Sequence, residues 1–246
     1  MMKLYSWDLS PYSARIRMQI YVKGLNDIAI EQAPKALTQT FYENHPIGRL
    51  PVLEIDGDGV PESAVIAEYI EEAYPAPSLL GATPRENAHV RSLARIGDVY
   101  LLNNTFMLSV QTRALSAESP VTAGVEAIVA LLGDQLAAAT KALDRMIGRD
   151  GFACLGRITL ADCAIVPALF FLETVVTRTG VANPIAANAN VSAYWAAIQQ
   201  QEHAARTLVE LRRGLEERHE LIRSGVLEKI RAESRAARQA VEMGVQ

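Results

Sequence analysis

Three short polar segments near the N-terminus carry residue types that could bind and activate a small thiol. Ser10-Pro11 follows a short apolar strand, Leu50-Pro51 precedes another strand, and Glu62-Ser63 precedes an apolar helical stripe. Serine followed by proline is typical of a helix start, and that end of a helix favours an anion. A hydroxyl that donates to a thiolate lowers the pKa of the thiol, and the thiolate is the nucleophile. The pattern predicts a site for anionic sulfur beside Ser10.

Two hydroxyl groups compete for that role. Ser10 stands at the expected helix start, whereas Ser13 lies nearly one turn into the helix, so Ser10 is preferred and Ser13 is the alternative. A purely structural interpretation of Ser10 also stands: its side chain could only cap the free amides of the helix.

The other two segments suit a ligand with peptide and amino-acid character. If the Leu50–Pro51 bond is cis, the backbone N–H and C=O of Leu50 turn outward and can pair with an extended peptide. Ser63 and its amide suit a ligand carboxylate, and Glu62 suits a ligand ammonium group. Arg49 adds a cation for a second carboxylate, although a solvated loop arginine explains it equally well.

Alternating and helical patterns supply the elements that position these residues. The N-terminal part predicts β-α-β and then β-β-α within about eighty residues, with the first two strands parallel. Tyr74–Ser78 interrupts the pattern as a linker, and the rest is expected to be helical. The expected strands are 3–7, 28–30, 52–55 and 60–61, and the expected helices are 11–23, 37–43, 63–73, 85–113, 121–148, 160–176, 190–200 and 202–211.

The last 36 residues differ in composition from the preceding sequence. From Leu211 to Gln246 the chain carries eight Lys/Arg and six Asp/Glu, with Leu or Ile recurring at helical spacing. Because both signs of charge are present, we expect a solvated helix that packs on the body or frays, rather than a basic partner-binding tail.

The composition limits the cellular compartments and the kinds of partner that we expect. The chain has 246 residues, 50% of them hydrophobic, and a net charge of −4. A nucleic-acid-binding surface normally shows a basic excess, so no nucleic acid is expected as a partner. The sequence contains no stretch of about eighteen apolar residues without a charged residue, and no apolar run opens the chain. We therefore expect a cytoplasmic protein without a membrane span. Cys154 and Cys163 are expected to be reduced thiols, and without further ligands at suitable spacing no metal is expected.

Together these segments resemble the soluble glutathione transferases. In the C-terminal half the resemblance rests mainly on Ile158–Asp162, which is similar to a helix-capping sequence of that family. The N-terminal segments that carry it are Leu4-Tyr5-Ser6, Ser10-Pro11-Tyr12-Ser13-Ala14-Arg15-Ile16-Arg17, Lys23-Gly24-Leu25, Pro46-Ile47-Gly48-Arg49-Leu50-Pro51-Val52-Leu53, and Glu62-Ser63 with Ile66, Tyr69-Ile70 and Tyr74-Pro75.

The resemblance implies an α+β fold in three parts. A thioredoxin-like β-α-β-β-β-α domain would span residues 1–76 and bind glutathione. An all-α helical-bundle domain would span 84–211 and serve the second substrate and the dimer. A charged helical extension would span 212–246, and it is not part of the family pattern.

The resemblance also implies roles for the site residues. Ser10 falls where serine-type classes carry the catalytic serine, whereas omega-type members carry cysteine. Leu50, with Pro51, matches the position whose backbone pairs with the cysteinyl unit of glutathione, although valine is commoner there. Glu62 and Ser63 match the γ-glutamyl contacts, and Arg49 lies where a cation often approaches the glycyl carboxylate. The second-substrate positions would be Leu9, Tyr12, Tyr100, Asn104 and Met107.

The expected function is conjugation of the glutathione thiolate to a small apolar electrophile by a homodimer. Asp98 is the candidate for a contact with the γ-glutamyl amine of a partner subunit. Two alternatives remain: a glutathione-dependent isomerase, β-aryl etherase or dehalogenase on the same fold, and a non-catalytic binding module.

Overall fold

A computed structural model describes residues 2–118 and 123–244. The chain divides into two compact units, one made of Met1–Ala73 with Glu210–Gln246, and the other of Tyr74–Val209. The first unit therefore combines the two ends of the chain, and it holds all three polar segments singled out above.

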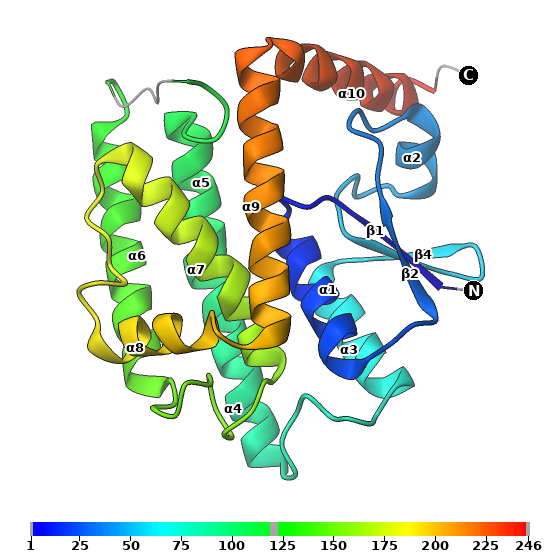
Figure 1. Cartoon of the computed structure of the whole chain (residues 1–246). Helices are drawn as coiled ribbons and strands as arrows, with labels where there is room; N and C mark the ends of the chain where they lie inside the picture. Colours follow the sequence, from blue (N-terminus) through cyan, green and yellow to red (C-terminus); the bar gives the residue numbers. More distant parts are fainter. Residues whose placement is uncertain (1, 119–122, 245–246) are drawn as a thin grey trace. The chain divides into compact units, whose positions relative to one another are not determined.

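The first unit is built on a four-stranded sheet in the order β2-β1-β3-β4 (Figure 1). β1 runs parallel to β2, whereas β1 with β3 and β3 with β4 are antiparallel, so the expected parallel pair is confirmed. The strands are β1 (Met2–Ser6), β2 (Ile28–Gln32), β3 (Val52–Ile55) and β4 (Asp58–Pro61).

The register of this sheet gathers several chain segments at one edge. Tyr5 near the end of β1 pairs with Val52 at the start of β3, and Val52 pairs with Pro61 at the end of β4. Ser6 pairs with Gln32 at the end of β2. The loops that leave β1, β2 and β4 and the loop that enters β3 therefore meet at the same end of the sheet.

Two helices cover one face of the sheet, and their packing explains why α1 is buried almost all round. α1 (Pro11–Lys23) begins at a serine cap and ends at Gly24, whose φ of 66° suits glycine. Buried polar side chains join it to α3 (Ser63–Ala73): Lys23 Nζ lies 2.9 Å from Glu71 Oε1, and Gln19 donates to the carbonyl oxygen of Ala67. These contacts satisfy polar groups that would otherwise be costly to bury.

The second unit is all-helical, as expected. Its helices are α4 (Pro84–Arg95), the π-helix η1 (Ile96–Leu102), α5 (Asn103–Thr112), α6 (Glu126–Met146), α7 (Leu160–Thr179) and α8 (Ala189–Ile198). The helix expected over 85–113 is interrupted by the π segment, and the expected start of the next helix at 121 lies outside the described residues.

α7 is the core helix of this unit. Thr159 and Asp162 form the expected capping box at its start. Among the described helices α7 alone is long and apolar enough to cross a membrane by composition, with a mean hydropathy of 1.8, but 83% of that stretch is buried inside the protein. Burial of this kind is typical of a core helix.

The C-terminal helices belong mostly to the first unit. α9 (Glu202–Arg223) continues twelve residues beyond its expected end at Leu211, and Gly225, with a φ of 71°, turns the chain into α10 (Val226–Glu242). α10 packs against α2 (Gln39–Asn44), where Ala237 and Val241 contact an apolar group that includes Leu37 and Tyr42. The expectation of a helical extension packed on the body is confirmed.

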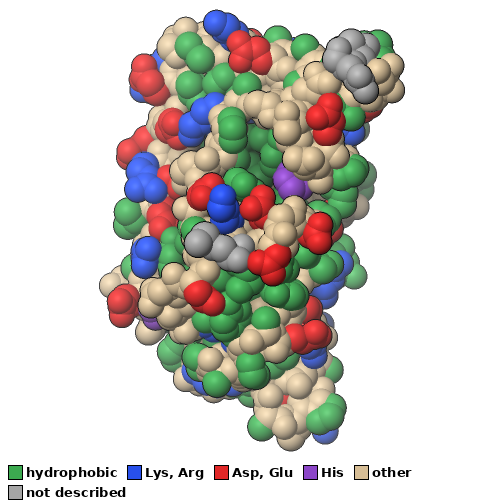
Figure 2. Space-filling view, turned by 90° about the vertical axis from the view of Figure 1, so that its right-hand side faces the viewer, with side chains coloured by type: hydrophobic (Ala, Val, Ile, Leu, Met, Phe, Trp, Pro, Cys, Tyr) green, Lys and Arg blue, Asp and Glu red, His purple; other side chains and the backbone are tan. Residues whose placement is uncertain are grey.

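Figure 2 shows one face of the molecule, on which acidic and basic side chains are scattered among hydrophobic ones. No continuous basic area is visible among the described side chains on this face. The mixed signs agree with the net charge of −4.

Candidate functional site

Ser10 caps α1 in a way that leaves its proton available. Its Oγ accepts a hydrogen bond from the amide of Ser13 at 3.2 Å, and its backbone is extended, as in an N-cap. Because the oxygen accepts from the helix, the O–H can donate outward to an anion. Ser13, in contrast, is fully buried, and no hydrogen-bond partner is found for its hydroxyl in the described structure. The geometry favours Ser10 as the hydroxyl that meets a ligand.

The Leu50–Pro51 bond, left open by the sequence, is cis. The side chain of Leu50 is buried, and in the described part of the chain its backbone makes no turn or loop hydrogen bond. The ladder of β3 begins only at Val52. The backbone of Leu50 is therefore placed to pair with an extended ligand at the edge where the four loops meet. Arg49, beside it, is exposed.

Glu62 and Ser63 follow β4 directly and lie at the same edge of the sheet. Glu62 is exposed and has a φ of 68°, a left-handed conformation that is uncommon for a residue with a side chain. Its carbonyl accepts the first hydrogen bond of α3, from Ile66, at 2.9 Å. Ser63 is 6% exposed at the N-terminus of that helix. Backbone outliers of this kind concentrate at ligand-binding sites, where they fix an unusual side-chain direction.

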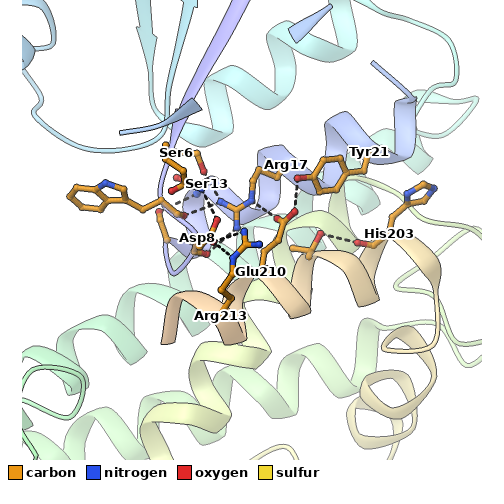
Figure 3. Close-up of polar contacts among 12 residues, drawn as sticks. Ser6, Asp8, Ser13, Arg17, Tyr21, His203, Glu210 and Arg213 are labelled. Atoms are coloured by element: carbon orange, nitrogen blue, oxygen red, sulfur yellow. Dashed lines mark hydrogen bonds and ion pairs between the residues drawn. The ribbon is translucent and has the colours of Figure 1, made fainter. Parts of the chain in front are cut away.

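Arg17 holds the loop that carries Ser10, and it was not assigned a role from the sequence. Arg17 is 1% exposed, and Figure 3 shows its guanidinium beside Asp8 and Glu210. It donates to Ser6 Oγ at 2.6 Å, to the carbonyl of Trp7 at 2.9 Å and to the carbonyl of Asp8 at 3.0 Å. Its charge is balanced by Glu210 of α9, whose Oε2 lies 2.7 Å from Arg17 Nε. The loop is thus fixed by a buried, fully paired cation.

A second pair ties the same loop to α9. Arg213 donates to the carboxylate of Asp8 at 2.6 Å, and this bond raises the pKa of Arg213 (Figure 3). Gln32 donates to the other oxygen of Asp8 at 2.7 Å. One helical step further, Gly214 lies so close to the loop that a Cβ there would be 2.9 Å from the Cβ of Asp8 and closer still to the amide nitrogen of Leu9. Only glycine permits this approach.

These loop contacts are the part of the site that the sequence did not reveal. The partners Arg17 and Glu210 are 193 residues apart, and no local pattern links them. One signal was available: Gly214 stands alone inside a charged helical stretch, and such a glycine often marks a close approach of backbones.

The five expected second-substrate positions fall in both units. Leu9 and Tyr12 belong to the first unit, and Leu9 lines a cavity of about 420 Å³ there. Tyr100, Asn104 and Met107 belong to the second unit. Of the five expected positions, Leu9 therefore lines this cavity, and the other four do not.

Asp98 is only 7% exposed, and its carboxylate lies 3.6 Å from Arg95. The expected contact with a ligand of the partner subunit stays a prediction. Cys154 and Cys163 are free and buried. In the described residues no three His, Cys, Asp or Glu side chains are grouped to hold a metal ion.

Solved structures share this fold. A glutathione S-transferase of Methylobacterium radiotolerans in complex with glutathione sulfonate superposes with a TM-score of 0.70 at 20% identity, over 84% of this chain and 93% of that one. A glutathione transferase family member of Pseudomonas fluorescens with bound glutathione gives 0.69 at 19% identity, over 84% and 98%.

Sequence comparisons agree with the fold. Maleylacetoacetate isomerase of Pseudomonas aeruginosa is 30% identical over 74% of this chain and 84% of its own length, and maleylpyruvate isomerase of a Ralstonia species is 31% identical over 68% and 80%. Residues 4–78 match the family model of the glutathione S-transferase N-terminal domain, and residues 126–197 match that of the C-terminal domain. The chain belongs to the glutathione S-transferase family.

Proposed function

We propose that this protein is a glutathione-dependent enzyme of the serine type, in which Ser10 stabilises the thiolate of bound glutathione. The observation that carries the proposal is the capping geometry of Ser10: its oxygen accepts from Ser13, so its proton is free to donate at the positive end of α1. A hydrogen bond to the charged form lowers the pKa of the bound thiol. The thiolate then supplies a nucleophile at neutral pH.

The remaining contacts suit the rest of the tripeptide. The free backbone of Leu50 beside Pro51 would pair with the cysteinyl unit, Glu62 with the ammonium group, and Ser63 at the start of α3 with the γ-glutamyl carboxylate. Arg49 would meet the glycyl carboxylate. Bound glutathione in a structure of the same fold supports glutathione as the ligand.

The reaction we propose is transfer of glutathione to an electrophilic carbon of a small apolar substrate. The protein stabilises the thiolate and positions the two reactants, which replaces a bimolecular encounter in solution by a reaction between two bound groups. The loop contacts of Arg17 and Arg213 would hold Ser10 in place during this step.

The test compares three variants. Ser10→Ala removes both cap and donor, whereas Ser10→Asp keeps a capping oxygen but cannot donate to a thiolate. Loss of a hydrogen bond to a charged group costs about 1.5–3 kcal/mol, so kcat should fall about 10- to 100-fold in both variants. Ser13→Ala is the matched control, because its buried hydroxyl has no partner among the described residues. A fully active Ser10→Asp, or an inactive and folded Ser13→Ala, would refute the assignment.

A glutathione-dependent isomerase is the second candidate, favoured by the maleylacetoacetate and maleylpyruvate isomerases among the relatives. Both reactions use the same thiolate but differ in stoichiometry. Conjugation consumes one glutathione per turnover, whereas isomerisation returns it. Thiol titration during turnover of each substrate class separates the two, and tight glutathione binding without any turnover would favour a non-catalytic binding module.

We further propose a cytoplasmic homodimer. Large apolar side chains remain exposed on η1 and α5 of the second unit, and a partner subunit would cover them. Sedimentation at micromolar concentration should give twice the chain mass. The exposed side chains are Val99, Tyr100, Phe106, Met107 and Val110.

A further inference from the structure

The cavity of the first unit lies between the two ends of the chain. Its walls come from the loop after β1, from the segment around α2, and from α9 and α10. Its volume of about 420 Å³ is within the range of small-molecule sites. Leu9, the neighbour of Ser10 in the sequence, lines it, so the cavity adjoins the loop that carries the residue we propose for catalysis.

Much of the wall is apolar. Leu37 comes from the segment before α2, and Leu221, Leu227 and Ile230 come from α9 and α10. With Leu9 they form a surface suited to a ring or a short hydrocarbon chain.

The charges on the same wall are mainly positive. Arg218, Arg231 and Arg235 line the part formed by α9 and α10. In the described structure Arg235 has no ion-pair partner, and Arg231 lies 2.8 Å from Glu228. The cavity wall therefore carries positive charge beyond what its own side chains balance.

The acidic side chains of the wall are already paired. Asp8 binds Arg213, and Glu217 lies 2.6 Å from Lys35. Neither carboxylate is thus paired with Arg235.

The arginines also affect one another. Burial and, to a smaller extent, the nearby charge of Arg231 together lower the pKa of Arg218 to about 10, although Glu228 opposes the shift. A cation in this position is incompletely solvated and stands beside a like charge. An anion bound between the two helices would relieve both penalties.

We propose that this cavity binds the second substrate, and that this substrate joins an apolar body to an anionic group such as a carboxylate. The apolar body would lie on the leucine wall near Leu9, and the anion would face Arg218, Arg231 and Arg235. The inference rests on the proposed function, because it places the substrate beside Ser10. It also gives the C-terminal extension a role that the family resemblance does not supply.

The probes are two electrophiles of the same size and different charge: 4-chloro-3-nitrobenzoate and 4-chloro-3-nitrobenzamide. In both, the thiolate sulfur bonds to the ring carbon that carries chlorine, the C–Cl bond breaks, and chloride leaves with the bonding pair. Each catalysed rate is divided by the rate with free glutathione, which removes the difference in intrinsic reactivity. Binding of each probe to the full-length protein without glutathione is measured separately by calorimetry.

We expect the benzoate to bind more tightly than the benzamide and to give the larger corrected kcat/KM. Loss of one exposed cationic contact is worth up to about 1 kcal/mol, so Arg235→Gln should weaken benzoate binding about fivefold and leave the benzamide unchanged. Arg235→Glu should weaken it about tenfold or more. Arg238→Gln is the matched control, because Arg238 lies on α10 but does not line the cavity.

Three results would overturn the proposal. The first is equal affinity of the unchanged protein for both probes, and the second is an equal effect of Arg235→Gln and Arg238→Gln. The third is a loss of glutathione affinity in Arg235→Gln, which would mean that the cavity holds the carboxylate of the tripeptide. Selective benzoate binding without turnover would instead refute the proposed function and leave the anion site in place.

Discussion

Gly214→Ala tests whether α9 holds the loop that carries Ser10 in place. A Cβ at this position would lie 2.9 Å from the carbonyl carbon and the Cβ of Asp8 and closer to the amide nitrogen of Leu9. The atoms that would have to yield belong to a backbone fixed by Arg17 and Arg213, not to a flexible side chain. The loop or the helix must therefore shift.

Two opposing effects determine how much Gly214→Ala changes the free energy of unfolding. Alanine favours a helix over glycine by about 1 kcal/mol, whereas overpacking against a fixed backbone costs about 1–3 kcal/mol. With the cost at its upper end, we expect a net loss of about 1–2 kcal/mol in the free energy of unfolding, or roughly 3–6 °C in Tm. Because Ser10 directly follows the displaced residues, kcat should fall more than the affinity for glutathione.

The measurements are Tm by calorimetry and steady-state kinetics with glutathione as the varied substrate. Gly133→Ala in α6 is the matched control, because its new Cβ would meet only the side chain of Val181 at an ordinary 3.4 Å. The control should be neutral or slightly stabilised. If Gly214→Ala were as stable and as active as the control, the idea that α9 fixes the loop would be wrong.

Two further predictions concern buried carboxylates. Glu210→Gln removes the charge beside buried Arg17, so it should lower the free energy of unfolding by about 2–3 kcal/mol and reduce kcat. Glu220→Gln is the control: it alters an exposed pair on the same helix and should change the free energy of unfolding by less than about 0.5 kcal/mol. Equal denaturation midpoints of the two variants would contradict this prediction. Burial raises the pKa of Asp162 to about 6 despite four hydrogen bonds. Between about pH 4 and pH 6 the folded protein therefore holds a proton that the unfolded chain releases. The stability contributed by this group is present below about pH 4 and is lost as pH rises through 6. Over this pH range the free energy of unfolding of the protein should fall relative to that of Asp162→Asn, and a rise relative to the variant would refute the sign.

Local signals were sufficient for most of the first unit. The Ser10-Pro11 start and the Gly24 stop of α1 depend on residues adjacent in sequence, and the structure has both. The short apolar segment after Pro51 likewise predicts β3, whose bounds agree with the expected 52–55. Such features need no knowledge of distant partners.

The errors arose where distant contacts decide the outcome. α9 was expected to end at Leu211, but it continues through Gly214 because that glycine fits against the loop of Leu9. The π turn of η1 was not foreseen either. There a Cβ on Gly97 would lie 3.2 Å from the backbone of Ala164, so tight packing of two helices sets the local geometry.

The distribution of buried charge explains why the C-terminal helices belong with the N-terminal unit. Arg17 is 1% exposed, and burying a cation is tolerated only when it is paired and hydrogen-bonded. One acceptor comes from the last residue of β1 and two come from the loop after it, but the compensating carboxylate comes from Glu210. Without α9 the N-terminal unit would retain an uncompensated charge under the loop that carries Ser10. The same helix that supplies this carboxylate also supplies Arg218 to the cavity wall, so the stability of the loop and the proposed preference for an anionic substrate would be linked through one element.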